Sequence, residues 1–376
     1  MKKLKKQGIF ILTFFVMLSF LSLPVLAEED FKTELYNRQY ESSGAEEIKN
    51  LLPEYVNEIL NELKITPENP NAIFAPEGKN VFRILIGFIT DGVETPLKTT
   101  LCIIGVLLIF ASLSGITLSE NSSMAVFVCF VGGIVATEPI FTVMEGVKTA
   151  VQTLSNFMFG LVPVYTGVML SSGSAAAAGG FSTLLLAATE GISYLISYCF
   201  LPLAGAVLCL GICGAISPVP IALRLSAWIK KSATWAMGIA TTVFLSILSL
   251  QNSFSLVTDG LVMRTSKAML STAIPIMGPA IAETINTARG CMELLKSSIG
   301  IYAVIAIIIM ALPTVVQLVL WRFSMWITAG VAEVFGMKQV ESLLRTVDFC
   351  VSVLLSAVCF ITLLFIISLA IGTGAR

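Results

Sequence analysis

The sequence predicts an all-α polytopic membrane protein, with about six to eight membrane helices of roughly 20 residues each. Of its 376 residues, 56% are hydrophobic and only 12% are charged, whereas soluble proteins carry roughly a quarter charged residues. Several apolar runs are long enough for a helix to cross a hydrocarbon core about 30 Å thick. Prolines and glycines interrupt these runs, a pattern typical of interrupted or re-entrant helices that neighbouring protein shields from lipid.

The first 27 residues have the pattern of a signal peptide. Lysines precede an apolar middle, Ile9–Leu21, and Val25-Leu26-Ala27 offers small residues before the acidic Glu28-Glu29-Asp30. An uncleaved anchor is the alternative interpretation. Both interpretations place residue 28 outside the cytoplasm, because the lysines are retained inside.

Residues 28–97 are predicted to form an exported polar and amphipathic segment, since this is the long polar stretch of the chain. Its apolar residues recur at helical spacing, which predicts one or two amphipathic helices: Ile48, Leu51, Leu52, Val56, Ile59, Leu60 and Leu63. This apolar face either docks a partner outside the membrane, or packs on neighbouring parts of the chain or on the membrane surface.

Residues 98–376 are predicted to form the polytopic membrane domain. We expect the first two spans to form a tight hairpin, and an amphipathic connector, Met144–Ser155, to follow the second. Ser217–Lys231 and Arg322–Arg345 are expected to be cytoplasmic loops because they carry Lys and Arg. Gln251–Gly300 has mixed character and predicts amphipathic helices. The expected spans are 101–118, 124–143, 157–170, 181–216, 232–250, 301–321 and 350–371.

The stretch Phe181–Ile216 is too long for one crossing and short for two. It contains Pro202 and several glycines, which favours an interrupted helix. With residue 28 outside the cytoplasm and Arg224 inside it, the chain must cross the membrane an odd number of times between them. Four apolar runs precede Arg224, however. Either Phe157–Leu170 is re-entrant, therefore, or the long stretch crosses twice.

Two glutamates fall within apolar runs and are candidate polar-path or structural residues. Glu190 is the single charged residue of its stretch, and we expect it to face the bundle interior because a carboxylate in lipid is costly. It either lines a polar path or relays protons, or it makes a structural hydrogen bond or lies at a helix end. Glu138, next to Pro139, marks the membrane boundary or a polar lining.

Four prolines suggest an internal repeat over residues 144–250 and 258–372. Pro163 and Pro275 lie 112 residues apart, and Pro202 and Pro313 lie 111 apart. Paired interrupted helices in transporters point to the site of passage. These four prolines are therefore candidates for that site as well.

The residue content argues against an enzyme. The chain has no His, which removes the commonest general base and metal ligand. Its eight cysteines form no C-x-x-C pair, and no phosphate-binding loop of the G-x-x-x-x-G-K-[ST] type occurs. With a net charge of −1 and no basic block, we expect no cofactor, no metal and no nucleic-acid partner.

The segment AMLSTAIPIMGPAIAETINTARGCMELLKSSIGIYAVIAIIIMALPTVVQLVLWRF, Ala268–Phe323, and the segment IKKSATW, Ile229–Trp235, resemble the stage III sporulation protein AE family of endospore-forming bacteria. The resemblance implies a multi-pass protein of the mother-cell membrane around the forespore. It implies partners from the same operon, including a separate ATPase and ring-forming proteins, and a forespore membrane partner. No short catalytic motif defines the family, so no active residue is carried over.

Together, these partners are expected to form a feeding or secretion-like channel required for endospore development. Two other hypotheses stay open at this point. The chain is a self-sufficient secondary transporter or permease that uses Glu190 and its broken helices, or it is a membrane assembly scaffold.

Overall fold

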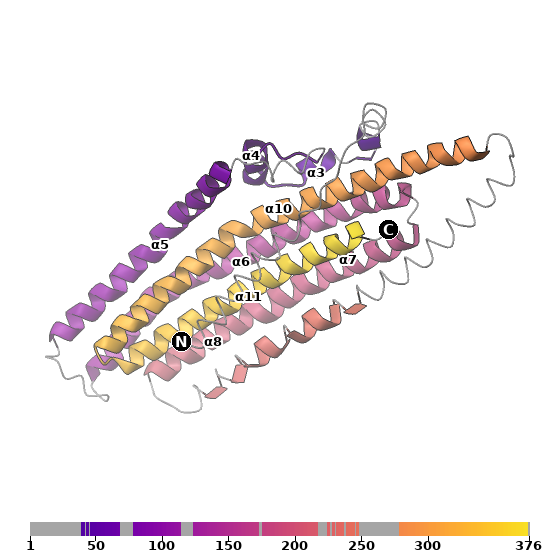
Figure 1. The fold of residues 1–376 in the computed structure, drawn as a ribbon. Helices are drawn as coiled ribbons and strands as arrows, with labels where there is room; N and C mark the ends of the chain where they lie inside the picture. The colour runs from indigo at the N-terminus through magenta and orange to yellow at the C-terminus, as the bar shows by residue number, and fades with distance from the viewer. Residues whose placement is uncertain are drawn as a thin grey trace.

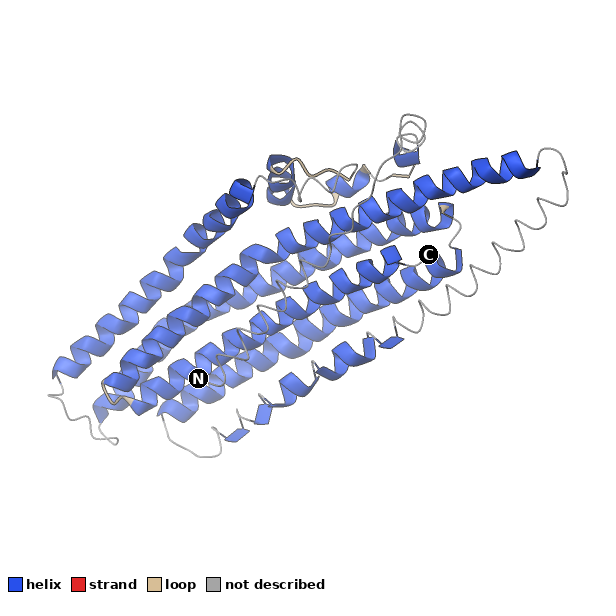
Figure 2. Ribbon diagram, viewed as in Figure 1, coloured by secondary structure: helices blue, strands red, loops and turns tan. Residues whose placement is uncertain are grey.

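The computed structural model describes residues 39–41, 43–44, 46–67, 78–113, 123–172, 175–216 and 278–374, with parts of 224–247. Helices make up nearly all of this described chain, and it contains no strand (Figures 1 and 2). The predicted all-α polytopic class is confirmed. Five of the described helical runs are long and apolar enough to cross a membrane: Arg83–Ser112, Pro139–Ser171, Ala178–Gly214, Gly290–Val334 and Lys338–Thr373.

The centre of the bundle is a helical hairpin of α10 (Gly278–Val334) and α11 (Lys338–Gly374), which pack along their length. The hairpin turn is tight because Gly336 adopts φ +70°, a conformation that favours glycine. The amide of Met337 donates to the carbonyl of Ala332, and the amide of Gly336 to that of Glu333. These two bonds form a Schellman cap that ends α10.

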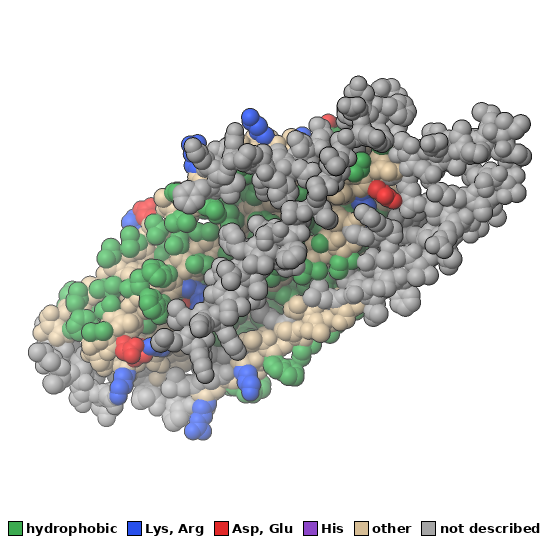
Figure 3. Space-filling model, in the orientation of Figure 1, with side chains coloured by type: hydrophobic (Ala, Val, Ile, Leu, Met, Phe, Trp, Pro, Cys, Tyr) green, Lys and Arg blue, Asp and Glu red, His purple; other side chains and the backbone are tan. Residues whose placement is uncertain are grey.

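The other long helices surround this hairpin (Figure 1). Helix α6 (Ser123–Ser171) packs on both α10 and α11, and α5 (Gly78–Leu113) packs on α10 and α6. Helices α7 (Ala175–Leu195) and α8 (Leu201–Ile216) cover α6 and α11. Hydrophobic side chains cover much of the surface over α5 (Figure 3), as expected of a helix exposed to lipid.

Helix α6 corrects the prediction of two separate spans, 124–143 and 157–170, joined by a connector. It is one helix of 49 residues that contains both Pro139 and Pro163. Each interior proline removes a hydrogen bond and costs roughly 3 kcal/mol in an isolated helix. Packing compensates for this cost, because one side of the helix is buried from Ile140 onward, at Val147, Val151, Leu154, Met158, Leu161, Tyr165 and Met169 among others.

The merged helix also changes the number of apolar runs before Arg224. Among the described residues, three such runs, α5, α6 and α7–α8, precede Arg224, which agrees with the odd number of crossings expected from the charges. The two predicted solutions were both wrong: Phe157–Leu170 belongs to a continuous helix, and 181–216 lies in a single helical run.

The stretch 181–216, predicted to contain an interrupted helix, is continuous, with a π-helical turn, η2 (Ile196–Phe200), between α7 and α8. Pro202 follows it and cannot donate a main-chain hydrogen bond four residues back. A π-turn shifts the main-chain hydrogen bonds of the helix by one residue at such a point, so that few main-chain amides and carbonyls are left unpaired. The chain therefore keeps a continuous helix here instead of breaking.

The prediction that Arg322–Arg345 is a loop was also wrong, because helices occupy nearly all of it, and its cytoplasmic location stays a prediction. Helix α10 continues to Val334 and α11 begins at Lys338. Arg322 and Arg345 instead join the two helices, through ion pairs with Asp348 and Glu333, and Arg345 also pairs with Glu341 within α11. Gln251–Met277 lies outside the described residues, and the predicted amphipathic helices there stay a prediction.

Candidate functional site

Glu190 lies on the outer side of α7 and is exposed. The expectation that it faces the bundle interior was therefore wrong. Its neighbour Thr189 is fully buried and donates to the carbonyl of Leu185. The side of α7 that faces the bundle therefore includes Thr189, the residue directly before Glu190. Tyr194 and Tyr198 share the outer surface of this helical run, with stacked rings whose centroids lie 4.5 Å apart. The polar-path role of Glu190 stays a prediction.

The four candidate prolines do not form a common site among the described residues. Pro163 and Pro202 are exposed on α6 and α8, and Pro313 is half-buried within α10. Pro275 and the side chain of Glu138 lie outside the described residues. The proposed repeat, which needs Pro275, stays a prediction.

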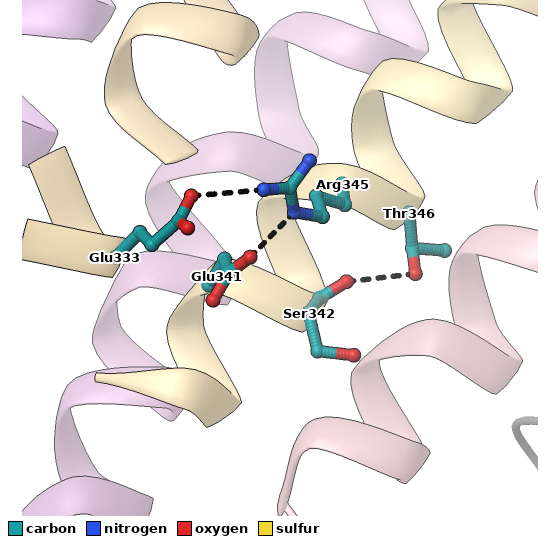
Figure 4. Close-up of polar contacts among 5 residues, drawn as sticks. All are labelled: Glu333, Glu341, Ser342, Arg345 and Thr346. Carbon is teal, nitrogen blue, oxygen red and sulfur yellow. Dashed lines mark hydrogen bonds and ion pairs between the residues drawn. The ribbon is translucent and has the colours of Figure 1, made fainter. Parts of the chain in front are cut away.

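The paired charges gather where α10 turns into α11. Arg345 donates from Nη2 to Oε2 of Glu333 at 3.0 Å and from Nε to Oε1 of Glu341 at 2.6 Å (Figure 4). Further from the turn, Nε of Arg322 lies 3.0 Å from Oδ1 of Asp348. These contacts neutralise charges on apolar helices and hold the hairpin in register.

A second polar contact joins α5 to α10. The hydroxyls of Thr100 and Ser324 are buried and lie within hydrogen-bond distance of each other and of the main-chain carbonyl of Pro96. Each hydroxyl has one proton, so one of them donates to the Pro96 carbonyl while the other donates to its neighbour's oxygen, and both protons are satisfied without water. Sequence analysis missed this site because Thr and Ser within apolar helices carry no pairing signal.

Two short helices, α3 (Glu47–Asn50) and α4 (Glu54–Glu62), lie across α6 and α10 (Figure 1). The hydroxyl of Tyr55 donates to the carbonyl of Met310 at 3.3 Å, and its partial burial raises the pKa of the phenol. The side chain of Leu51 rests on Gly160 of α6. The predicted apolar face is buried, at Ile48, Leu52, Val56 and Leu60. Other parts of the same chain therefore cover that face.

The opposite side of α4 is charged. Glu54, Glu58 and Glu62 recur every four residues and are all exposed, since that spacing keeps side chains on one face of a helix. The same spacing of four separates the buried residues Ile48, Leu52, Val56 and Leu60. The amphipathic helix was thus predictable from the sequence, but its docking position on the bundle was not.

The end of the bundle opposite the charged turn is closely packed and apolar. A β-carbon at Gly300 would overlap Thr373, and one at Gly372 would lie 2.8 Å from the ring of Phe181. Tyr165 is buried between these helices and packs on Phe181 with ring centroids 5.5 Å apart. Among the described residues no group of His, Cys, Asp and Glu could hold a metal ion.

Comparison with known proteins gives one consistent result. The family described as stage III sporulation protein AE matches residues 73–375. The stage III sporulation protein AE of Bacillus subtilis (strain 168) is 26% identical over 222 residues, which cover 59% of this chain and 56% of that protein. The chain thus aligns with about half the length of this relative. No solved structure matches.

Proposed function

This chain belongs to the stage III sporulation protein AE family, and from that premise we propose that it is the polytopic membrane component of a channel complex between mother cell and forespore. The family gives it a role in sporulation, and its five apolar helical runs make it a membrane protein. The channel, its location in the mother-cell membrane around the forespore and its partners are parts of the proposal.

The observation that carries the proposal is the family match, which spans the whole described bundle from α5 to α11. The bundle itself favours a component over a self-sufficient transporter. Glu190 faces outward and the described candidate prolines do not converge, so the described residues that the transporter hypothesis invokes do not form one site. A component of a larger channel does not require such a site within one chain.

The proposed partners follow the same reasoning. A separate ATPase would supply energy, because the chain has no phosphate-binding loop. Ring-forming proteins of the same operon and a forespore membrane partner would extend the passage beyond this membrane.

Cross-linking in sporulating cells, followed by purification of the tagged chain and mass spectrometry, tests the proposal. We expect the ATPase, the ring-forming proteins and the forespore partner to co-purify, and none of them with an unrelated tagged membrane protein of the same cells. Recovery of the chain alone, with solute flux by the purified protein in liposomes, would instead establish the transporter.

Glu190→Gln separates the same hypotheses genetically. A channel component with an outward Glu190 should form spores at close to the normal frequency. A transporter that uses this carboxylate should lose spore formation and liposome flux together.

A further inference from the structure

Glu190 is exposed on α7 at the depth of the hydrocarbon core. The helical run of α7, η2 and α8 packs against α11, and two contacts set their relative height (Figure 1). A β-carbon added at Gly372 would lie 2.8 Å from the ring of Phe181. Further along, Sγ of Cys350 donates to the carbonyl of Ala204 at 3.3 Å. Glu190 lies between these two contacts, about 13 Å along the run from Phe181 at 1.5 Å per residue.

Both α11 and the run that carries Glu190 are otherwise uncharged at that depth. Helix α11 has no charged residue from Phe349 to Gly374, a stretch about 40 Å long. A hydrocarbon core about 30 Å thick includes the level of Glu190 wherever the core is placed along that stretch. The run itself has no other charged residue from Ala175 to Ile216. Glu190 is therefore a single carboxylate on an outer surface within the membrane.

This surface is poorly suited to lipid. A carboxylate inside a bilayer faces protein or a water-filled cavity and pairs with another polar group, because lipid does not solvate it. Tyr194 and Tyr198 are 60% and 68% exposed on the same side of the run, whereas exposed tyrosines of membrane helices concentrate at the interface with water. The spacing of four residues places Glu190, Tyr194 and Tyr198 along one line.

The three side chains have the chemistry of a cation site. A carboxylate forms charge-assisted hydrogen bonds with an ammonium or guanidinium group, and the face of a tyrosine ring attracts a cation. The rings of Tyr194 and Tyr198 stack with centroids 4.5 Å and planes 30° apart, so they form one aromatic surface a helical turn from Glu190. Two different groups thus favour the same positively charged partner.

Small residues continue the line on both sides of these three. Ala187 and Gly191 are exposed, as are Pro202 and Ala206 beyond the tyrosines. Nothing lies within 4 Å of a β-carbon added at Gly191, so its surface is open. Helices associate in lipid where small residues let them approach closely. The line therefore suits a second helix better than a free ion.

We propose that Glu190, Tyr194 and Tyr198 form a docking face for a membrane helix of a partner protein, and that this helix presents a lysine or arginine at mid-depth. The basic group pairs with the Glu190 carboxylate and lies against the tyrosine rings, while Ala187 and Gly191 allow the helices to approach. This inference deepens the proposed function by assigning the face that meets another membrane component, and it rests on that function for the existence of such a component.

Charge complementarity favours a basic partner over a second copy of this chain. Two copies related by a two-fold axis in the same membrane present the same face to each other. Glu190 would then lie at the same depth as its counterpart, and like charges across an interface disfavour association. A helix with one basic residue removes that conflict and neutralises the carboxylate.

Photo-cross-linking of the full-length tagged chain in sporulating cells tests the inference. Benzoylphenylalanine replaces Tyr198 as the photoreactive probe. The control position is Leu101 of α5, which is 61% exposed. Adducts are identified by mass spectrometry from chains that carry Glu190, Glu190→Lys or Glu190→Gln.

We expect position 198 to give a discrete adduct with a membrane helix that contains lysine or arginine. Glu190→Lys should lower its yield at least about tenfold, because it sets like charges against each other, and glutamate in place of the partner's basic residue should restore it. Glu190→Gln should keep most of the adduct, since its amide oxygen still accepts a hydrogen bond. Adducts from position 101 should not respond to either variant.

Gly191→Leu is the second variant. Its side chain occupies the surface that the partner helix approaches, and it should lower the yield from position 198 while the thermal melting curve of the purified chain stays unchanged. An adduct of the chain with itself, an adduct with lipid alone, or a yield that Glu190→Lys and Gly191→Leu leave unchanged would overturn the inference. Equal losses at positions 198 and 101 would do so as well. Sporulation partners can co-purify through other surfaces without this adduct, so failure here is distinguishable from failure of the proposed function.

Discussion

Gly300 of α10 lies so close to Thr373 of α11 that a β-carbon at residue 300 would overlap the Thr373 methyl group. The two helices meet here with backbone against side chain, next to the buried ring of Tyr165. Without a hydrophobic driving force between helices in lipid, association depends on such close approach of small residues. The contact therefore fixes the spacing of the central hairpin at the end opposite its turn.

Gly300→Ala should destabilise the protein by about 1–3 kcal/mol, because overpacking a closed contact forces the helices apart. The thermal midpoint in detergent, followed by tryptophan fluorescence, measures the effect. Gly290→Ala is the matched control on the same helix, since nothing lies within 4 Å of its added carbon.

Thr373→Ser removes the methyl group that the new carbon would meet, while its hydroxyl can still donate to the Ala370 carbonyl as Thr373 does. The double variant should therefore recover most of the loss. If Gly290→Ala and Gly300→Ala lowered the midpoint equally, the close contact would have no special role.

Asp348→Asn should cost more stability than Glu333→Gln. The side chains of Arg322 and Asp348 are 23% and 31% exposed, so loss of the carboxylate leaves a partly desolvated guanidinium, at about 1–3 kcal/mol. Glu333 is 62% exposed, and such surface pairs contribute about 0–1 kcal/mol. Arg345 also keeps its bond to Glu341.

Urea unfolding of the two variants in the same detergent makes the comparison. A double-mutant cycle with Arg322→Gln isolates the pair from the other contacts of Arg322. The reverse order of stabilities would show that the inner pair does not hold the hairpin.

Gly160→Val should release α3 and α4 from the bundle. A β-carbon at Gly160 would lie 2.5 and 2.6 Å from the two methyl carbons of Leu51, so the side chain of Leu51 must leave its place. Amide hydrogen exchange in α4 should accelerate by roughly tenfold, as expected for a local opening that needs about 1.4 kcal/mol less.

Exchange in α11 should not change, since α11 does not depend on this contact. Gly167→Val is the control in the same helix, because nothing lies within 4 Å of its added carbon. Equal acceleration in both variants would attribute the effect to the helix propensity of valine and not to Leu51.

Reporter fusions should place Ser172 and Thr287 outside the cytoplasm and Lys231 inside. Three apolar runs precede Lys231, and α10 runs antiparallel to α11, whose charged turn lies on the cytoplasmic side by its Lys and Arg content. Phosphatase activity should appear at Ser172 and Thr287, and β-galactosidase activity at Lys231. A cytoplasmic result at Thr287 would contradict the orientation of α10.

Sequence spacing alone predicted the features that depend on residues within a few positions of one another. The amphipathic residues of α4 and the apolar character of the five helical runs were predicted, because hydrophobic spacing acts within a few residues. The boundaries of the long helices were not predicted from the sequence. Pro139 and Pro163 suggested breaks in α6, and Arg322 and Arg345 suggested a loop, because their compensating contacts come from distant segments.

The sequence by itself determined the class of this protein, because long apolar, charge-poor runs of about 20 residues or more are typical of membrane helices, which satisfy their main-chain hydrogen bonds within each segment. Only the tertiary structure decided which prolines are tolerated, that Glu190 faces outward, and that Tyr55 of α4 bonds to the Met310 carbonyl of α10. These facts depend on packing between residues far apart in the chain, such as Tyr55 and Met310, and no local spacing encodes that packing.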